Sequence, residues 1–155
     1  MVRKLLIVNV MSIDLTKINN IEGVADSFIY SRMGTLLHPT LQYVDTKIMQ
    51  LGRDIALSAT LLEKIKQMVE FIELVYEDRR LIARITRDYF ILVVCDINAD
   101  VTLIRLTINV VNEVIKDDKE IQRLLKKSME KKDLIADASG DGDLKALFAK
   151  MKISV

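Results

Sequence analysis

Three apolar runs separated by only a few polar residues constrain this chain more than any other feature. They cover residues 71–77, 81–86 and 89–96, and the joints between them read EDRR and TRD. Such short polar joints between β-branched runs are typical of consecutive antiparallel strands, because parallel neighbours need a long crossover connection. The pattern therefore predicts a three-stranded antiparallel meander.

The first and last of these runs differ in their patterning. YFILVVCD is apolar throughout and is expected at the centre of the sheet, whereas FIELVYE partly alternates and is a candidate edge strand. Side chains of a strand point alternately to its two faces. The alternation divides the first run into Ile72, Leu74 and Tyr76 on one face, and Phe71, Glu73 and Val75 on the other.

Helical periodicity dominates two other segments. Apolar residues recur at steps of three and four over residues 45–69, with Asp45 as the expected N-cap, and again over residues 100–116, with Asp100 as the cap. A further helix is expected after the sequence KDDKE. Its apolar residues are Ile121, Leu124, Leu125 and Met129.

A hairpin is expected in the stretch EGVADSFIYSRMGTLLHPT, residues 22–40. Residues 24–30 and 35–38 form its strands, and SRMG forms the turn, with Gly34 accepting a positive φ. A short helix over residues 14–21 precedes it. Residues 4–10 are apolar and β-branched, and they fit either a strand or the start of a helix.

This order of elements predicts an α+β sandwich in which helices cover a five-stranded antiparallel sheet, in the order α-β-β-α-β-β-β-α. The chain has 155 residues, of which 50% are hydrophobic, so it can bury a sizeable core. We expect one domain over residues 1–117. A C-terminal helical extension follows over residues 118–155, with a Gly-rich joint near 139–142.

The stretch LTKINNIEGVADSFIYSRMGTLL resembles the start of Roadblock/MglB-type domains, the family of the Roadblock dynein light chain. In that family a short helix ends in Gly-Val and leads into the first hairpin, and the long helix, the meander and a last helix follow. The resemblance covers roughly residues 15–117. Longin, profilin-like and some sensory domains share similar orders of elements, and the segments before and after this region depart from the minimal family pattern.

The resemblance implies a homodimer in which the third strand and the long helix of two subunits pair to give one continuous sheet. Such pairing would cover an apolar edge strand. The small helix residues also fit ordinary packing of the helix on its own sheet, which is favoured for most of them. The candidate interface residues are Gly52, Ala56, Ala59, Phe71, Glu73 and Val75. The resemblance further implies binding to a Ras-like small GTPase, as regulator or scaffold.

Charge and hydropathy argue against several other partners. With 23 basic and 22 acidic residues, the net charge of +1 gives no reason to expect nucleic acid or an anionic membrane as the main partner. The apolar run of residues 5–10 is too short for a signal peptide, and no segment is long enough to span a bilayer. A cytoplasmic protein without direct membrane insertion is expected.

Few residues could support catalysis. His38 is the only histidine and Cys95 the only cysteine, which excludes a multi-histidine metal site and an internal disulfide. His38 is favoured as a structural or exposed residue, and Cys95 as a buried core thiol. The sequence DASGDGD mimics half of an EF-hand loop, but Phe148 stands where the bidentate glutamate is required. We therefore expect no enzyme activity, no cofactor and no metal.

The prediction is a non-enzymatic homodimeric regulator or scaffold that binds a Ras-like small GTPase and favours one of its nucleotide states. None of the four arginines near the meander, Arg79, Arg80, Arg84 and Arg87, is assigned as an arginine finger. A small-molecule-sensing PAS or profilin-like domain is the alternative, and it would need a cavity between helix and sheet. Candidate partner-binding residues in the extension are Leu144, Leu147, Phe148 and Met151.

Overall fold

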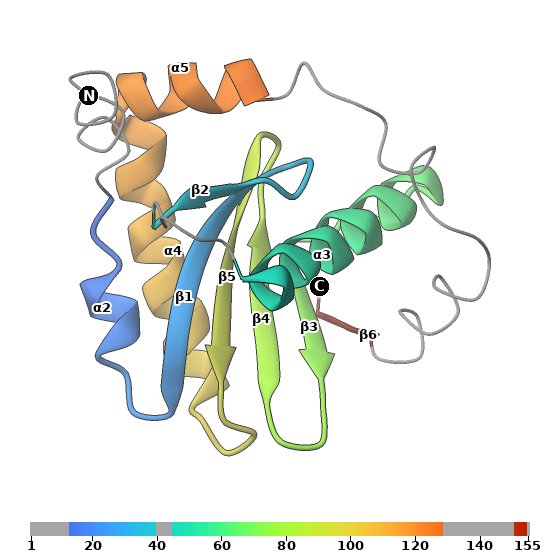
Figure 1. Cartoon of the computed structure of the whole chain (residues 1–155), viewed down its shortest axis with the longest axis vertical. Helices are drawn as coiled ribbons and strands as arrows, with labels where there is room; N and C mark the ends of the chain where they lie inside the picture. Colours follow the sequence, from blue (N-terminus) through green and yellow to red (C-terminus); the bar gives the residue numbers. More distant parts are fainter. Residues whose placement is uncertain (1–12, 40–44, 129–150, 155) are drawn as a thin grey trace.

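An antiparallel sheet forms the middle of three layers, with α3 across one face and α2 and α4 along the other (Figure 1). The computed structural model describes residues 13–39, 45–128 and 151–154. Its elements are α2 (Thr16–Asn19), β1 (Val24–Ser31), β2 (Leu36–His38), α3 (Thr46–Lys64), β3 (Phe71–Val75), β4 (Arg80–Ile85), β5 (Tyr89–Cys95), α4 (Val101–Asp117), α5 (Lys119–Ser128) and β6 (Met151–Ser154).

Within the described residues the strand order is β2-β1-β5-β4-β3-β6, and every neighbouring pair is antiparallel. β5 lies in the interior of the sheet, between β1 and β4, as its continuous apolar sequence predicts. The α+β sandwich is confirmed, and its first five strands follow the expected order. β3 would be the edge of that five-stranded sheet, but β6 extends the sheet beyond it.

The expected helical extension was wrong at its end, because residues 151–154 form a strand. Met151 pairs with Leu74, Lys152 with Glu73, Ile153 with Ile72 and Ser154 with Phe71. An edge strand offers unpaired backbone N–H and C=O groups, and a short segment can satisfy them whatever its own periodicity. α5 is helical as expected, and the joint near 139–142 lies outside the described residues.

Both long helices begin at their predicted caps. The carboxylate of Asp45 accepts a hydrogen bond from Lys47 N at 2.9 Å, and that of Asp100 accepts one from Leu103 N at 3.1 Å. α3, however, ends at Lys64 rather than at residue 69. Lys66 takes a φ of 60° and turns the chain toward β3. The apolar periodicity therefore continued past the end of the helix.

Two apolar clusters lie on opposite faces of the sheet, and β3 contributes to both. Ile72 and Leu74 are buried beneath α3, whereas Phe71 is buried on the α4 side. This alternation confirms the predicted faces of β3. Gly34 has the expected positive φ, 91°. Residues 4–10, predicted as either strand or helix, fall outside the described residues.

Candidate interaction surfaces

The small residues of α3 let the helix approach its own sheet. A Cβ on Gly52 would lie 2.4 Å from Cε1 of Tyr30, closer than any real contact. Tyr30 is fully buried, its hydroxyl donates to the carbonyl of Ile48 at 2.7 Å, and its ring stacks on Phe90 with centroids 5.1 Å apart. Gly52 is therefore required where helix and strand come closest.

The other two small candidates occupy the same internal layer. Ala56 and Ala59 are buried in the cluster between α3 and the sheet. This arrangement matches the ordinary packing that the sequence favoured for most of these positions. Their role in a dimer interface stays a prediction.

The candidates on β3 lie in a different environment from those on α3. Phe71 is buried in the α4-side cluster, and two guanidinium groups lie over its ring: Arg84 at 5.3 Å and Arg105 at 4.4 Å from the centroid. Glu73 is only 5% exposed, and its carboxylate lies 3.4 Å from Nε of Arg80. Val75 is 37% exposed. The six candidates thus do not form one exposed patch.

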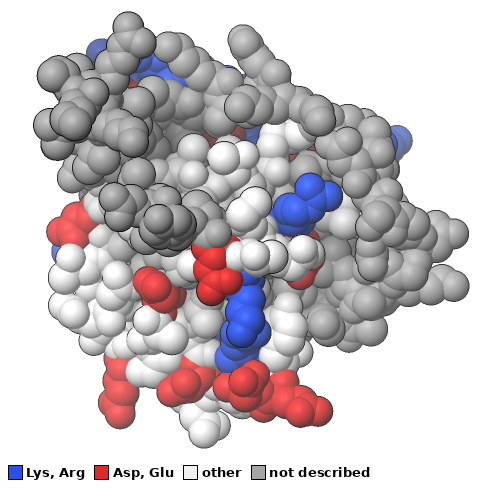
Figure 2. Space-filling view, in the orientation of Figure 1, with Lys and Arg blue, Asp and Glu red and all other residues white. Residues whose placement is uncertain are grey.

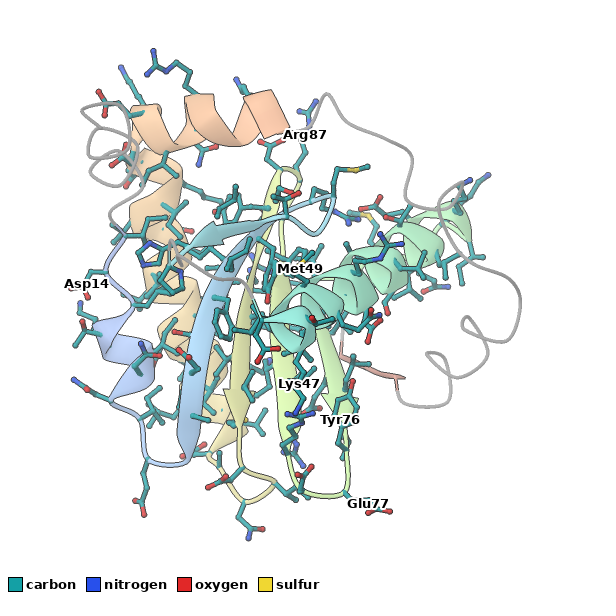
Figure 3. All side chains as sticks on the ribbon, viewed as in Figure 1. Asp14, Lys47, Met49, Tyr76, Glu77 and Arg87 are labelled. Carbon is teal, nitrogen blue, oxygen red and sulfur yellow. The ribbon has the colours of Figure 1, made fainter. Side chains whose placement is uncertain are left out.

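Three of the four meander arginines have contacts within the chain. Arg79 lies over the ring of Tyr76 at 5.4 Å, Arg80 pairs with Glu73, and Arg84 forms an ion pair with Glu70. Arg87 follows β4 in the β4–β5 turn, at the opposite end of the sheet from Glu77 in the β3–β4 turn (Figure 3). These contacts give the first three arginines structural roles.

Arg32 is a buried cation that the sequence reasoning missed, because SRMG was treated only as a turn. It is 7% exposed. One of its terminal nitrogens lies 2.6 Å from Oε1 of Glu63, and the other donates to the carbonyl of Ala56 at 3.5 Å. Arg32 therefore ties the hairpin turn to the middle and end of α3.

The outer face of α4 carries an apolar stripe that the sequence reasoning also missed. The predicted inner stripe of α4 is confirmed by the burial of Ile104, Ile108 and Ile115. A second stripe is between 46% and 65% exposed, and its steps of three and four residues were visible in the sequence. It consists of Leu103, Leu106, Val110 and Val114, and we call it the α4 stripe.

Two shallow hollows flank the α4 stripe. One of about 270 Å³ lies between α2, α4 and α5, where Ile13, Val110 and Ile121 contribute to its wall. The other, of about 280 Å³, lies between the start of β3 and α4, and Phe71 and Arg105 line it. Small-molecule sites usually occupy about 300–1,000 Å³. Both hollows are therefore small for a ligand pocket.

Reactive groups are few in the part of the chain that the structure describes. Burial raises the pKa of the Cys95 thiol to about 11, which keeps it protonated and unreactive. Burial also raises the pKa of Tyr89 to about 12, and the Tyr89 hydroxyl donates to Oδ1 of Asn112. No group of three metal-ligating side chains occurs among residues 13–39, 45–128 and 151–154. No helix in those ranges is long and apolar enough to cross a membrane.

Surface charge is unevenly distributed on the face seen in Figure 2. Acidic side chains gather along its lower rim, where the β3–β4 and β5–α4 connections lie, and the basic side chains lie higher. Glu77, Asp78 and Asp96 are exposed residues of these connections. Exposed Arg79 lies in the same β3–β4 connection, so the rim is not uniformly acidic.

The candidate residues in the extension are only partly described. Met151 belongs to β6, so an amphipathic helix cannot continue from Leu144 through to it. Leu144, Leu147 and Phe148 lie outside the described residues. Their role in partner binding stays a prediction.

Comparison with known proteins supports the fold. No family model and no curated protein matches the sequence. Among solved structures, Myxococcus xanthus MglB is similar with a TM-score of 0.52 and 19% identity, covering 79% of this chain and 96% of MglB. A Roadblock/LC7 domain from Streptomyces avermitilis is similar with a TM-score of 0.50 and 8% identity, covering 72% of this chain and 92% of that domain. The chain therefore has a Roadblock/MglB-like fold, as the resemblance predicted.

Proposed function

We propose that this chain is a non-enzymatic cytoplasmic regulator or scaffold that forms a homodimer and binds a Ras-like small GTPase. The observation that carries the proposal is the likeness to MglB, which extends over nearly all of that protein. Binding to such GTPases is what the Roadblock/MglB resemblance implies. Fold alone does not define function, so the proposal needs a direct test.

The mechanism would be selective binding of one nucleotide state. A partner shifts an equilibrium only by its difference in affinity for the two states. We assign no arginine finger, so any effect on hydrolysis would come from ordering the GTPase's own groups. Arg79, Arg80 and Arg84 are engaged within this chain, whereas Arg87 is exposed.

The alternative of a small-molecule sensor receives less support. The hollow between the start of β3 and α4 does lie between a helix and the sheet, as a sensor cavity would, but at about 280 Å³ it is small for a ligand pocket and open at the surface. The other interface of helix and sheet is the one beneath α3. That interface is filled by large side chains such as Tyr30, Phe90 and Leu62. We therefore favour a protein partner over a small ligand.

The experiment is affinity capture with the immobilised full chain. Lysate of the source cells is passed over it with GDP or with a non-hydrolysable GTP analogue, and retained proteins are identified by mass spectrometry. The expected result is a Ras-like GTPase enriched in one nucleotide state. Retention of no GTPase in either state by the folded protein would overturn the proposal.

Two double variants would locate the contact. Leu147→Asp with Phe148→Asp alters the predicted partner-binding segment, and Leu106→Asp with Val110→Asp alters the α4 stripe. Both pairs add two carboxylates, so each serves as the charge-matched control for the other. Loss of capture by only the first pair would support the extension as the contact. Loss by only the second would place the contact on α4.

A further inference from the structure

We propose that β6 is a removable cover for the edge of β3, and that a second copy of this chain pairs along that edge only after β6 has left it. The inference rests on the homodimer of the proposed function but not on GTPase binding. It assigns a role to residues 151–154, which the sequence reasoning had placed in a helix.

The outer edge of β3 has room for one strand. The inner edge is taken by β4 from Phe71↔Arg84 to Val75↔Arg80. The outer edge is taken by β6 from Phe71↔Ser154 to Leu74↔Met151. A strand of a second copy would need the same N–H and C=O groups that β6 uses. Occupation by β6 and by a second copy are therefore mutually exclusive.

The sequence of β6 matches the alternation of β3. Met151 and Ile153 stand opposite Leu74 and Ile72, which are buried on the α3 side. Lys152 stands opposite Glu73, on the other face of the strand. A shift by one residue would put Lys152 opposite an apolar residue of β3. The observed register therefore agrees with the alternation of apolar and polar residues in both strands.

Charge favours β6 over a second copy in one simple arrangement. The buried carboxylate of Glu73 lies 3.4 Å from Nε of Arg80, and the register places a second basic residue, Lys152, opposite Glu73. If two copies of β3 paired antiparallel about residue 73, the two Glu73 carboxylates would face each other. Like charges directly opposite each other destabilise a strand pair. The covered state is thus the expected resting state, and self-pairing must shift its register or tolerate the repulsion.

The cover can leave without disturbing the rest of the fold. β6 has four residues and pairs with no described strand except β3. Residues 129–150 join it to α5, and a chain of that length can span on the order of 70 Å when extended. Release of β6 breaks its pairing with β3 at one edge of the sheet and with no other described strand. What remains is β3 with an unpaired outer edge, in which Glu73 stands among apolar residues.

The test compares the dimer dissociation constant of four proteins by sedimentation over a dilution series. They are the full chain, a chain ending at Lys150, Lys152→Glu and the matched control Lys152→Arg. We expect the truncated chain to dimerise more tightly than the full chain, on the order of tenfold or more. Lys152→Glu should shift in the same direction, because it places Glu opposite Glu73, and Lys152→Arg should behave as the full chain does.

Hydrogen exchange of residues 71–74 provides a second measurement. The N–H groups of alternate residues point toward β6, and the others point toward β4. The amides that face β6 should be protected in the full chain and should exchange faster in the truncated chain at concentrations where it is monomeric, whereas those that face β4 should change less. If the truncated chain does not fold, Lys152→Glu and Lys152→Arg still provide the comparison at full length.

The outcomes separate this inference from the proposed function. Equal dimerisation by the full chain, the truncated chain and Lys152→Glu would overturn the cover and leave the homodimer intact. Loss of an existing dimer on truncation would also overturn it, because β6 would then be joining the copies. A folded protein that stays monomeric in all four forms would overturn both the cover and the homodimer.

Discussion

Replacing Gly52 by alanine tests whether the small face of α3 serves the chain's own packing. In an exposed helix position, Gly→Ala stabilises by about 1 kcal/mol. Here the added Cβ would lie 2.4 and 2.5 Å from two ring atoms of Tyr30, and 2.9 Å from the carbonyl oxygen of Gly34. The ring cannot easily retreat, because its hydroxyl is bonded to Ile48 and its face stacks on Phe90.

The clash should outweigh the gain in helix propensity. Overpacking a well-filled core costs about 1–3 kcal/mol in the free energy of unfolding. For a contact as short as this one, we expect a cost at or above the upper end of that range. We expect Gly52→Ala to lower the free energy of unfolding by about 2 kcal/mol, after subtracting the propensity gain. Urea unfolding followed by circular dichroism measures this change. A drop in Tm of about 5 °C should accompany it.

A double-mutant cycle isolates the contact with Tyr30. In the background Tyr30→Leu, Gly52→Ala should cost less than it does alone, with a coupling of about 1–2 kcal/mol. A Gly52→Ala variant as stable as the parent would refute the packing argument. If that variant also failed to dimerise, Gly52 would instead be an interface residue.

Three further predictions concern single interactions. Burial raises the pKa of Cys95 from 9.0 to about 11 and that of Tyr89 to about 12, so both groups lose their protons at lower pH in the unfolded chain than in the folded protein. The stability present at pH 8 should therefore fall as pH rises above about 9. Cys95→Ala should remove the first part of that fall, and urea midpoints measured against pH would show it. Asn112→Ala should cost about 2 kcal/mol by leaving the buried Tyr89 hydroxyl without its acceptor, and Tyr89→Phe combined with Asn112→Leu should cost less than the sum of the two single changes. Asp100→Ala should cost about 1 kcal/mol by removing the cap of α4, whereas Thr102→Ala in the same turn should change the thermal midpoint little.

Local chemistry explains which elements the sequence predicted well. Asp45 and Asp100 cap their helices through their own neighbouring backbone, so the signal lies within a few residues. β5 lies inside the sheet and has a nearly continuous apolar sequence, because both of its faces are buried. These features depend little on distant parts of the chain.

Features set by tertiary contacts were harder to predict. The strand at residues 151–154 exists through pairing with β3, about 80 residues away in sequence, and four residues carry too little periodicity to show it. The role of Gly52 depends on Tyr30, which a helical pattern cannot reveal. Past Lys64 the apolar spacing of α3 continues through Ile65, yet Ile65 is 63% exposed, because the chain must turn into β3.

The central claim is that this chain binds a Ras-like GTPase and distinguishes its nucleotide states. Isothermal titration of the captured GTPase into the full chain, once loaded with GDP and once with a non-hydrolysable GTP analogue, tests it most directly. The account predicts dissociation constants that differ on the order of tenfold or more between the two states. Equal affinity for both states, or no binding in either, would contradict it.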